Sequence, residues 1–247
     1  MQEIEKPSPR QLIEAARVTR SPTLDLDRCG LDELPKAVRR LTHLESLNLR
    51  FNNIEELPHW LTELDRLAEL DLQANDIAEV PEVIGELTGL RVLSLSENNL
   101  EDEPLDFLGG LKNLTRLSLV DTRSDRLPES IGDLTRLTEL NLYMDWFNCS
   151  PESLPDSLGQ LTNLTRLELS RNGLSTLPEW VRRLTSLQEL GLWMNEGMTE
   201  IPEWIGELTA LTELSLPCAP DDEVLAVLRR LPRLRKLSLD GEDVDLA

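Results

Sequence analysis

The sequence predicts an α/β solenoid in which about ten short parallel strands line a concave face, short helical turns form the convex side, and a cap closes each end. The first observation is a repeated pattern, L-x-x-L-x-L-x-x-N-x-L-x-x-L-P, whose copies begin 23 to 27 residues apart. Such a period is typical of proteins in which each turn packs on its neighbours. The second is composition: 4% of the residues are aromatic, so the core must be built from leucine in register. The copies begin at Leu44, Leu67, Leu90, Leu114, Leu137, Leu164, Leu187, Leu211 and Leu234.

Before the first turn, the sequence predicts disorder over residues 1–8 and a capping helix over residues 9–20. Residues 1–8 are polar and contain proline, as unstructured termini often do. Ser8 precedes Pro9, and Gln11 stands three positions after the serine. This is the pattern of an N-cap, a first-turn proline and a capping box. The helix would cover the open end of the first turn with an apolar stripe of Leu12, Ile13, Ala16 and Val18.

The repeats run over residues 21–247, which we interpret as one domain. A degenerate copy with Ser21 in place of the first leucine precedes the others and brings the number of turns to ten. In each turn the L-x-L pair alternates between two faces, as a short strand does, and strands should stack in parallel about 4.8 Å apart. The asparagine should bond buried backbone groups of adjacent turns. It stands at Asn52, Asn75, Asn98, Asn172 and Asn195, and Cys29 and Thr122 replace it in two turns.

The remaining segments predict the convex side and the C-terminal cap. Stretches such as Leu-Pro-Glu-Ser-Ile-Gly at residues 127–132 predict short helical turns. The last two turns are irregular, because residues 221–230 begin with acids and end with two arginines, which suits a helix and its dipole. A final strand should follow, and after it an acidic tail that begins at Asp240.

The repeat, of the form LPxxIGxLxxLxxLxLxxN, resembles that of intracellular leucine-rich-repeat proteins. This group includes the plant Ras-group-related repeat proteins, the repeat regions of bacterial Roco proteins and the repeat domains of bacterial effectors. The resemblance implies a leucine-rich-repeat horseshoe that recognises a partner on its concave face or rim. It also implies that any enzymatic activity belongs to an attached domain. We expect none here, since the sequence contains no G-x-x-x-x-G-K-[ST] phosphate loop and the repeats fill it to its last residues.

The charge of the chain limits its partners. It carries 25 Lys and Arg against 46 Asp and Glu, a net charge of -21 and a pI near 4.5. Affinity for nucleic acid depends on clustered basic residues, so we expect no nucleic-acid partner. The acidity has two open interpretations: solubility of a self-repelling monomer, or attraction of a protein partner that presents basic residues beside apolar ones.

The cysteines and the hydropathy indicate a compartment. Cys29, Cys149 and Cys218 are far apart and odd in number, without the paired clusters that cap secreted repeat proteins. No signal peptide is visible, and no segment approaches the ~20 apolar residues of a membrane span. We therefore expect a cytoplasmic protein that does not bind membranes.

Residues suited to catalysis are few. His43 and His59 are the only histidines, and they lie in non-concave positions, which is too little for a zinc site. Cys218 and Asp221 resemble the surroundings of a ligase cysteine, but without a base the thiol is better explained as a loop residue before a helix. Trp60, Trp180 and Trp204 share one position of the repeat and should pack on the convex side. We expect no enzyme, cofactor or metal.

The concave positions offer a recognition surface. One ladder consists of the residue before the second leucine of each turn, and its charges alternate in sign from Arg116 to Glu189. Such a ladder either pairs with itself or recognises a partner, and both interpretations stay open. Its members are Glu69, Val92, Arg116, Glu139, Arg166, Glu189, Glu213 and Lys236.

A second group of residues favours binding in turns six to eight. The only tyrosine, a tryptophan outside the convex position and two methionines converge there, and the turn that begins at Leu137 carries the longest insertion. Aromatic residues that the core does not need are enriched at binding hot spots. Alternatively, the two insertion aromatics fold back to seal the insertion. With Arg166, the predicted site consists of Tyr143, Met144, Trp146, Phe147, Ser170, Arg171, Trp193 and Met194.

Two functions follow from these observations. The first is a non-enzymatic protein-binding module, acting as a scaffold, adaptor or inhibitor, that uses the concave face and rim near turns six to eight. The alternative is the substrate-recognition part of a bacterial effector or signalling enzyme whose catalytic domain lies elsewhere. Twenty-one arginines against four lysines favour a bacterial source.

Overall fold

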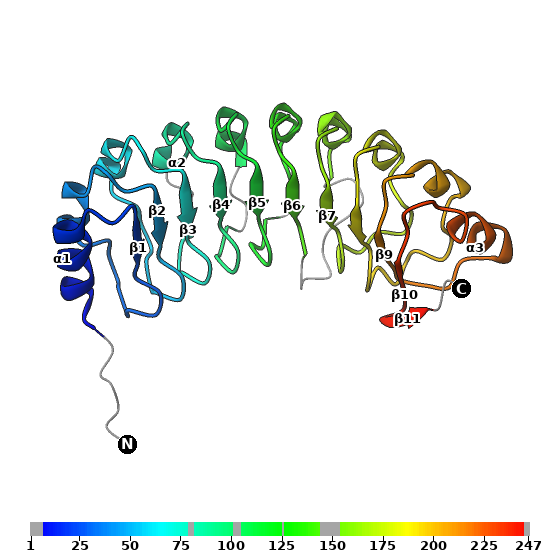
Figure 1. The fold of residues 1–247 in the computed structure, drawn as a ribbon, viewed down its shortest axis with the longest axis horizontal. Helices are drawn as coiled ribbons and strands as arrows, with labels where there is room; N and C mark the ends of the chain where they lie inside the picture. Colours follow the sequence, from blue (N-terminus) through cyan, green and yellow to red (C-terminus); the bar gives the residue numbers. More distant parts are fainter. Residues whose placement is uncertain (1–6, 79–81, 101–104, 125, 144–153, 245–247) are drawn as a thin grey trace, which may run out of the picture.

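The computed structural model describes residues 7–78, 82–100, 105–124, 126–143 and 154–244 of the 247. The chain forms an open arc with one sheet, in which β1 to β11 are neighbours in chain order (Figure 1). The first ten strands are parallel. The predicted solenoid with about ten parallel strands is therefore confirmed.

Most strands are three residues long, and each pairs in register with the same positions of the next turn. The central leucine of each strand points into the core, while the residues on either side of it face the concave surface. The parallel strands are β1 (Thr23–Asp25), β2 (Ser46–Asn48), β3 (Glu69–Asp71), β4 (Val92–Ser94), β5 (Arg116–Ser118), β6 (Glu139–Asn141), β7 (Arg166–Glu168), β8 (Glu189–Gly191), β9 (Glu213–Leu216) and β10 (Lys236–Leu239).

Short helical turns follow the outer edge of the arc (Figure 1). Most are 3-10 turns preceded by a proline in extended conformation, as Pro128 and Pro178 show. Proline suits this place because its φ is fixed and it has no N–H to leave unpaired. The turns are η1 (Lys36–Arg40), η2 (His59–Glu63), α2 (Glu82–Glu86), η3 (Leu105–Gly110), η4 (Glu129–Asp133), η6 (Asp156–Gln160), η7 (Glu179–Arg183) and η8 (Glu203–Glu207).

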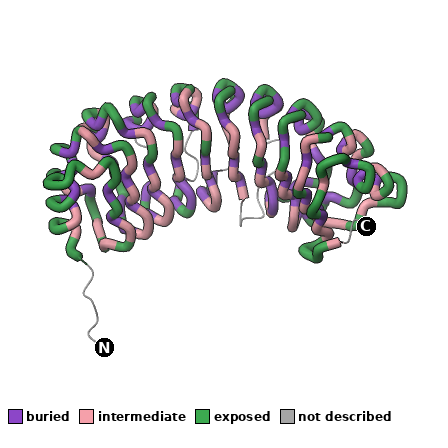
Figure 2. The backbone as a smooth tube through the Cα atoms, in the orientation of Figure 1, coloured by how far each residue is buried: buried purple, intermediate pink, exposed green. Residues whose placement is uncertain are grey.

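The core lies between the strands and the convex turns and consists mainly of leucine. Figure 2 shows buried residues in purple in successive turns along the arc. The three tryptophans of the shared repeat position contribute to the core as predicted. Trp180 is 2% exposed, while Trp60 and Trp204 are partly buried against the same cluster. These rings therefore stabilise the fold on its convex side.

Buried asparagine side chains join successive turns, as predicted. In Asn195, the Nδ2 group donates to the carbonyl oxygens of Leu169 (3.0 Å) and Leu192 (2.7 Å). Its Oδ1 accepts the backbone N–H groups of Asn172 and Leu174, both at 3.0 Å. Asn52, Asn75 and Asn98 likewise bond the preceding turn. One amide thus satisfies backbone groups of two turns that burial would otherwise leave unpaired.

The N-terminal cap is α1 (Pro9–Thr19), which packs against β1 and η1. The predicted capping box is present: Ser8 Oγ accepts the N–H of Gln11, and Gln11 Oε1 accepts the N–H of Ser8 at 2.8 Å. The inclusion of Val18 in the apolar stripe is wrong, because its side chain is 66% exposed. Val18 lies two positions after the buried Ala16, about 200° around the helix. Of the predicted disordered segment, residues 1–6 lie outside the described residues.

The C-terminal cap consists of a helix and a hairpin. Asp221 caps α3 (Asp222–Leu228) by accepting the N–H of Val224 at 2.8 Å. The predicted acidic tail is wrong for residues 240–244, because β11 (Glu242–Val244) returns antiparallel to β10. Asp240 and Gly241 have φ values of 50° and 83°, and an Asp-Gly pair with positive φ is the favoured two-residue hairpin turn.

Truncating a strand leucine should destabilise the protein far more than removing a convex carboxylate. Leu140 and Leu167 are each 1% exposed, so Leu140→Ala or Leu167→Ala should lower the free energy of unfolding by ~2–5 kcal/mol by leaving a cavity. Glu203→Ala, on the exposed outer edge, should change it by less than about 0.5 kcal/mol. Urea denaturation measures all three, and equal midpoints would contradict the buried column.

Asn195→Ala should also be costly, because it removes partners from four buried backbone groups. We expect a loss of at least ~2–3 kcal/mol, since each unsatisfied buried group costs about 1–3 kcal/mol. Asn163→Ala is the matched control: within the described part of the chain, its exposed side chain donates one hydrogen bond, to the carbonyl oxygen of Thr135 at 2.7 Å. A comparable loss in both variants would show that the amide of Asn195 is not what joins the turns.

Candidate functional site

Three ladders of side chains cover the concave face, because alternate residues of a strand point to the same side. The first ladder precedes the central leucines: Thr23, Ser46, Glu69, Val92, Arg116, Glu139, Arg166, Glu189, Glu213 and Lys236. The middle ladder follows them: Asp25, Asn48, Asp71, Ser94, Ser118, Asn141, Glu168, Gly191, Ser215 and Ser238. The third ladder stands two positions further on: Asp27, Arg50, Gln73, Ser96, Val120, Tyr143, Ser170, Trp193 and Pro217.

A groove of about 610 Å³ runs across the strands from β4 to β10. The first ladder forms one side of it, and the middle ladder with the central leucines forms its floor. Most of the middle-ladder residues here are small, namely Ser94, Ser118, Gly191, Ser215 and Ser238. We call this row of middle-ladder positions the lane, and Asn141 and Glu168 are its two largest residues.

The first ladder partly pairs with itself. The structure confirms the register that places Arg116, Glu139, Arg166 and Glu189 side by side. An ion pair joins Arg166 to Glu189, with Nη2 2.5 Å from Oε2. The hydrogen bond to Glu189 raises the pKa of the Arg166 guanidinium. Arg166, one of the predicted site residues, thus has an intramolecular partner on the neighbouring strand.

The middle ladder supports the backbone as well as lining the groove. Asn141 Oδ1 accepts the N–H of Tyr143 at 3.1 Å, and Glu168 Oε1 accepts the N–H of Ser170 at 2.8 Å. These N–H groups lie just beyond the three-residue strands and need a local acceptor. This ladder was not predicted as a surface, although its members are recognisable in the sequence as the residues inside each L-x-L pair.

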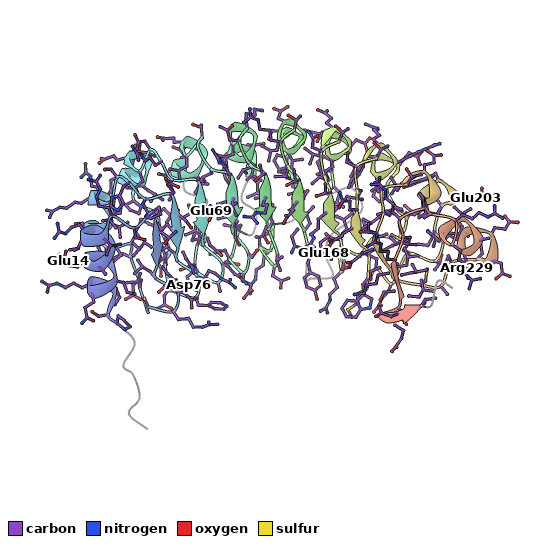
Figure 3. The ribbon with its side chains drawn as sticks, in the orientation of Figure 1. Glu14, Glu69, Asp76, Glu168, Glu203 and Arg229 are labelled. Carbon is purple, nitrogen blue, oxygen red and sulfur yellow. The ribbon has the colours of Figure 1, made fainter. Side chains whose placement is uncertain are left out.

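Glu168 has an unusual position that depends on glycine at its neighbour. Gly191 is its register partner on β8, and a Cβ atom at Gly191 would collide with both carboxylate oxygens of Glu168. The carboxylate therefore lies across the floor of the groove, over the place that any larger residue would fill. Figure 3 shows Glu168 and Glu69 over the row of strands, with Glu203 at the outer edge.

The structure brings together part of the predicted site beside this groove. Tyr143 and Trp193 are half-buried on the third ladder, with Ser170 between them on the intervening turn. Ser170 is 4% exposed, so the space between the rings is largely covered. Arg171 reaches back one turn, and its Nη1 donates to the hydroxyl of Tyr143 at 3.2 Å.

Trp193 has a neighbour that the sequence did not reveal. A Cβ atom at Gly241 would lie 3.3 Å from Nε1 of Trp193 and 3.7 Å from its Cε2. The turn between β10 and β11 thus packs against the indole ring, two strands away from β8. The signal in the sequence is the Asp-Gly pair, which predicts a hairpin but not the ring it meets.

The rim next to the third ladder has left-handed backbone. Arg171 and Met194 have φ values of 60° and 57°, which residues other than glycine seldom adopt. The same position in the second turn holds Phe51, whose ring centroid lies 3.9 Å from the guanidinium carbon of Arg28. This cation–π contact at the other end of the rim was also missed. Met144, Trp146 and Phe147 lie outside the described residues.

The features suited to chemistry have structural explanations. Partial burial, and then the charge of Asp240, raise the pKa of the Cys218 thiol, which keeps it protonated. The Asp221 carboxylate is occupied in capping α3. Among the described residues there is no group of three or more His, Cys, Asp or Glu side chains that could hold a metal ion. Over that same part of the chain, no helix has the length and apolar character needed to cross a bilayer.

A family model for the leucine-rich repeat region matches residues 22–117, 89–196 and 152–246. The chain belongs to the leucine-rich-repeat family. A search of curated protein sequences gives no significant match. The repeats of this leucine-rich-repeat protein therefore account for its sheet, its convex turns and the concave groove.

Solved structures support the same fold. An internalin of Listeria monocytogenes is 21% identical with a TM-score of 0.60, and the match covers 98% of this chain and 86% of the internalin. The ectodomain of the Arabidopsis receptor kinase HAESA, in complex with a peptide hormone ligand, is 29% identical with a TM-score of 0.69. That match covers 87% of this chain and 37% of the ectodomain. A leucine-rich-repeat protein of Leptospira interrogans is 25% identical with a TM-score of 0.50, over 92% of this chain and 75% of that protein.

Gly241→Ala should disturb Trp193. The substitution places an alanine at a φ of 83° and adds a Cβ against the indole. We expect a loss of about 1–2 kcal/mol from the left-handed backbone, together with a shift of the Trp193 indole N–H resonance in an NMR spectrum. Gly30→Ala is the control, because Gly30 has a φ of 62° but open space around it. A Trp193 resonance that stays in place in the Gly241 variant would exclude this contact.

Proposed function

We propose that this chain is a non-enzymatic protein-binding module that acts as a scaffold, adaptor or inhibitor. Its partner engages the concave face and the adjoining rim near turns six to eight, which carry β6 to β8. The observation that carries the proposal is the meeting of a groove with two half-exposed aromatic rings, Tyr143 and Trp193, on the ladder beside it. The strand leucines already fill the core, so the core does not require these rings.

The residue types support a protein partner. Tyrosine, tryptophan and arginine are enriched at binding hot spots, and Tyr143, Arg171 and Trp193 lie on three successive turns. The hydrogen bond from Arg171 to Tyr143 reduces the freedom of both side chains before a partner arrives, which lowers the entropy lost on binding.

The charge distribution supports a partner with basic residues beside an apolar anchor. Acids outnumber bases on the concave side of the first turns, where Asp25, Asp27, Glu69 and Asp71 accompany Arg28 and Arg50. The net charge of -21 adds a long-range attraction for such a partner. A cytoplasmic location is part of the proposal and is supported by the three widely separated cysteines.

The comparisons support the general class of function. The Arabidopsis ectodomain, which resembles this chain over 87% of its length, is in complex with a peptide hormone ligand. Leucine-rich-repeat regions commonly act as protein-interaction modules. This likeness supports binding of a polypeptide, and the residues of turns six to eight supply the proposed position.

Substitutions at the two aromatic residues test the position. A partner captured from native lysate with the full chain as bait should bind Trp193→Ala or Tyr143→Ala more weakly by ~2 kcal/mol or more, as expected for a hot spot. Calorimetry on the purified pair measures this loss. The association rate should also fall as salt is added, because screening weakens attraction to the acidic face.

Gln73→Ala is the matched control, since Gln73 holds the same ladder position on the third turn, outside turns six to eight. Its affinity for the partner should stay close to that of the unsubstituted chain. A loss in Gln73→Ala as large as in Trp193→Ala would place the binding surface elsewhere. A Trp193 variant that has lost its folded structure at the assay temperature would assign the ring a structural role.

A further inference from the structure

The groove is long enough to receive several residues of a polypeptide. It crosses seven strands, from β4 to β10, and six steps of ~4.8 Å give a length of roughly 29 Å. An extended segment that follows the groove can turn alternate side chains toward its floor over this whole length, whereas a helix turns only one of its faces toward it.

Small residues occupy both ends of the lane. Serine and glycine form its floor on β4, β5, β8, β9 and β10, so the tallest side chains of the floor are Asn141 and Glu168 at its centre. A segment laid across the strands would span about nine residues at ~3.3 Å each. Its polar backbone would meet serine hydroxyl groups beside the apolar surface of the strand leucines.

A negative charge occupies the centre of this lane. The Glu168 carboxylate lies over Gly191, and Ser170 N–H holds its Oε1 at 2.8 Å. Within the described residues, Glu168 forms no ion pair, because the nearby guanidinium of Arg166 is bonded to Glu189. Across the whole groove there are four carboxylates, Glu139, Glu168, Glu189 and Glu213, against the three cations Arg116, Arg166 and Lys236.

From these observations we propose that the groove receives an extended segment of the partner, about nine residues long, with a Lys or Arg side chain seated on Glu168. The inference rests on the proposed function and specifies the part of the partner that is recognised. Gly191 is a positioning residue in this scheme, because its missing side chain lets the carboxylate lie in the lane. The third ladder, with Tyr143 and Trp193, then borders the segment and receives its apolar side chains.

The test selects ligands without knowing the partner. A library of random 12-residue peptides displayed on phage is selected against the full chain, and the enriched peptides are synthesised. They should share a basic residue, and transferred NOE spectra should show sequential Hα–HN contacts of an extended bound form. Fluorescence polarisation then compares the variants, and Glu168→Gln should weaken binding at least about tenfold, or ~1.4 kcal/mol.

Two further variants separate charge from structure. Glu168→Gln keeps an oxygen acceptor for Ser170 N–H, so the fold should be unchanged, and Gly191→Ser should weaken binding similarly by displacing the carboxylate. Glu69→Gln is the control: it removes the same charge from the same concave face on β3, outside the groove, and should change affinity less than twofold. Replacing the basic peptide residue by leucine should have little further effect in Glu168→Gln, because the pair is already broken.

The outcomes distinguish this inference from the proposed function. Peptides that bind as helices, or that bind Glu168→Gln as tightly as the unsubstituted chain, overturn it. The inference is also overturned if the selection enriches no peptides while a folded partner binds Trp193→Ala more weakly than the unsubstituted chain. In that case the proposed function stands. Coupling between Glu168 and a basic peptide residue supports the extended segment even if the aromatic variants bind the partner normally, and in that case the proposed role of Tyr143 and Trp193 fails.

Discussion

The fold depends on how buried backbone groups are satisfied where each turn leaves its strand. A leucine column supplies the driving force for burial, but it cannot bond the N–H and C=O groups that the turn carries inward. The asparagine amide bonds both kinds of group. Asn195 accepts hydrogen bonds from two N–H groups of the preceding turn and donates to one carbonyl oxygen of that turn and one of its own. Because each amide reaches one turn back, the repeat length is constrained. The first turn has Cys29 in place of the asparagine, because it is preceded by α1 and not by another repeat whose backbone needs an amide. The N–H of Cys29 itself donates to Asn52.

Because leucines and asparagines hold the turns together, the side chains on the concave face can differ from one turn to the next. The central leucines, and the asparagines where they occur, fix the position of the turns, and the side chains of the first and third ladders lie outside the leucine column. The backbone beside these ladders adopts a left-handed conformation. The residue before the asparagine has φ near +55° in several turns, as in Phe51, Ala74 and Glu97. Such a strained residue persists where its surroundings determine it, and here the adjacent amide bonds do so. The rim side chains consequently point in a direction that the repeat sets, whatever their identity.

How far the sequence predicts the structure depends on whether a feature is local to one repeat. Strand register, convex tryptophans and the capping box of Ser8 follow from patterns within a few residues, and all are present. The prediction for Val18 is wrong because an apolar residue joins the buried stripe of a helix only if its angle around the helix axis matches that of the other stripe residues. The contact between Trp193 and Gly241 could not be predicted in this way, since it depends on how the last hairpin folds back over two turns. The same is true of Glu168 and Gly191, which are 23 positions apart and acquire meaning as a pair only once the register is known.

The shape of the groove bears on the kind of ligand as much as on its position. Small-molecule sites are enclosed and mostly apolar, with a few convergent polar groups. This groove is instead a long lane with hydroxyl groups on its floor and alternating charges along one side. A small molecule would leave most of such a lane in water, whereas a polypeptide can follow it over several strands and gather many weak contacts. The carboxylate of Glu168 would then fix the register of the segment, because it is the charged group at the centre of the floor and its place depends on a glycine one turn away.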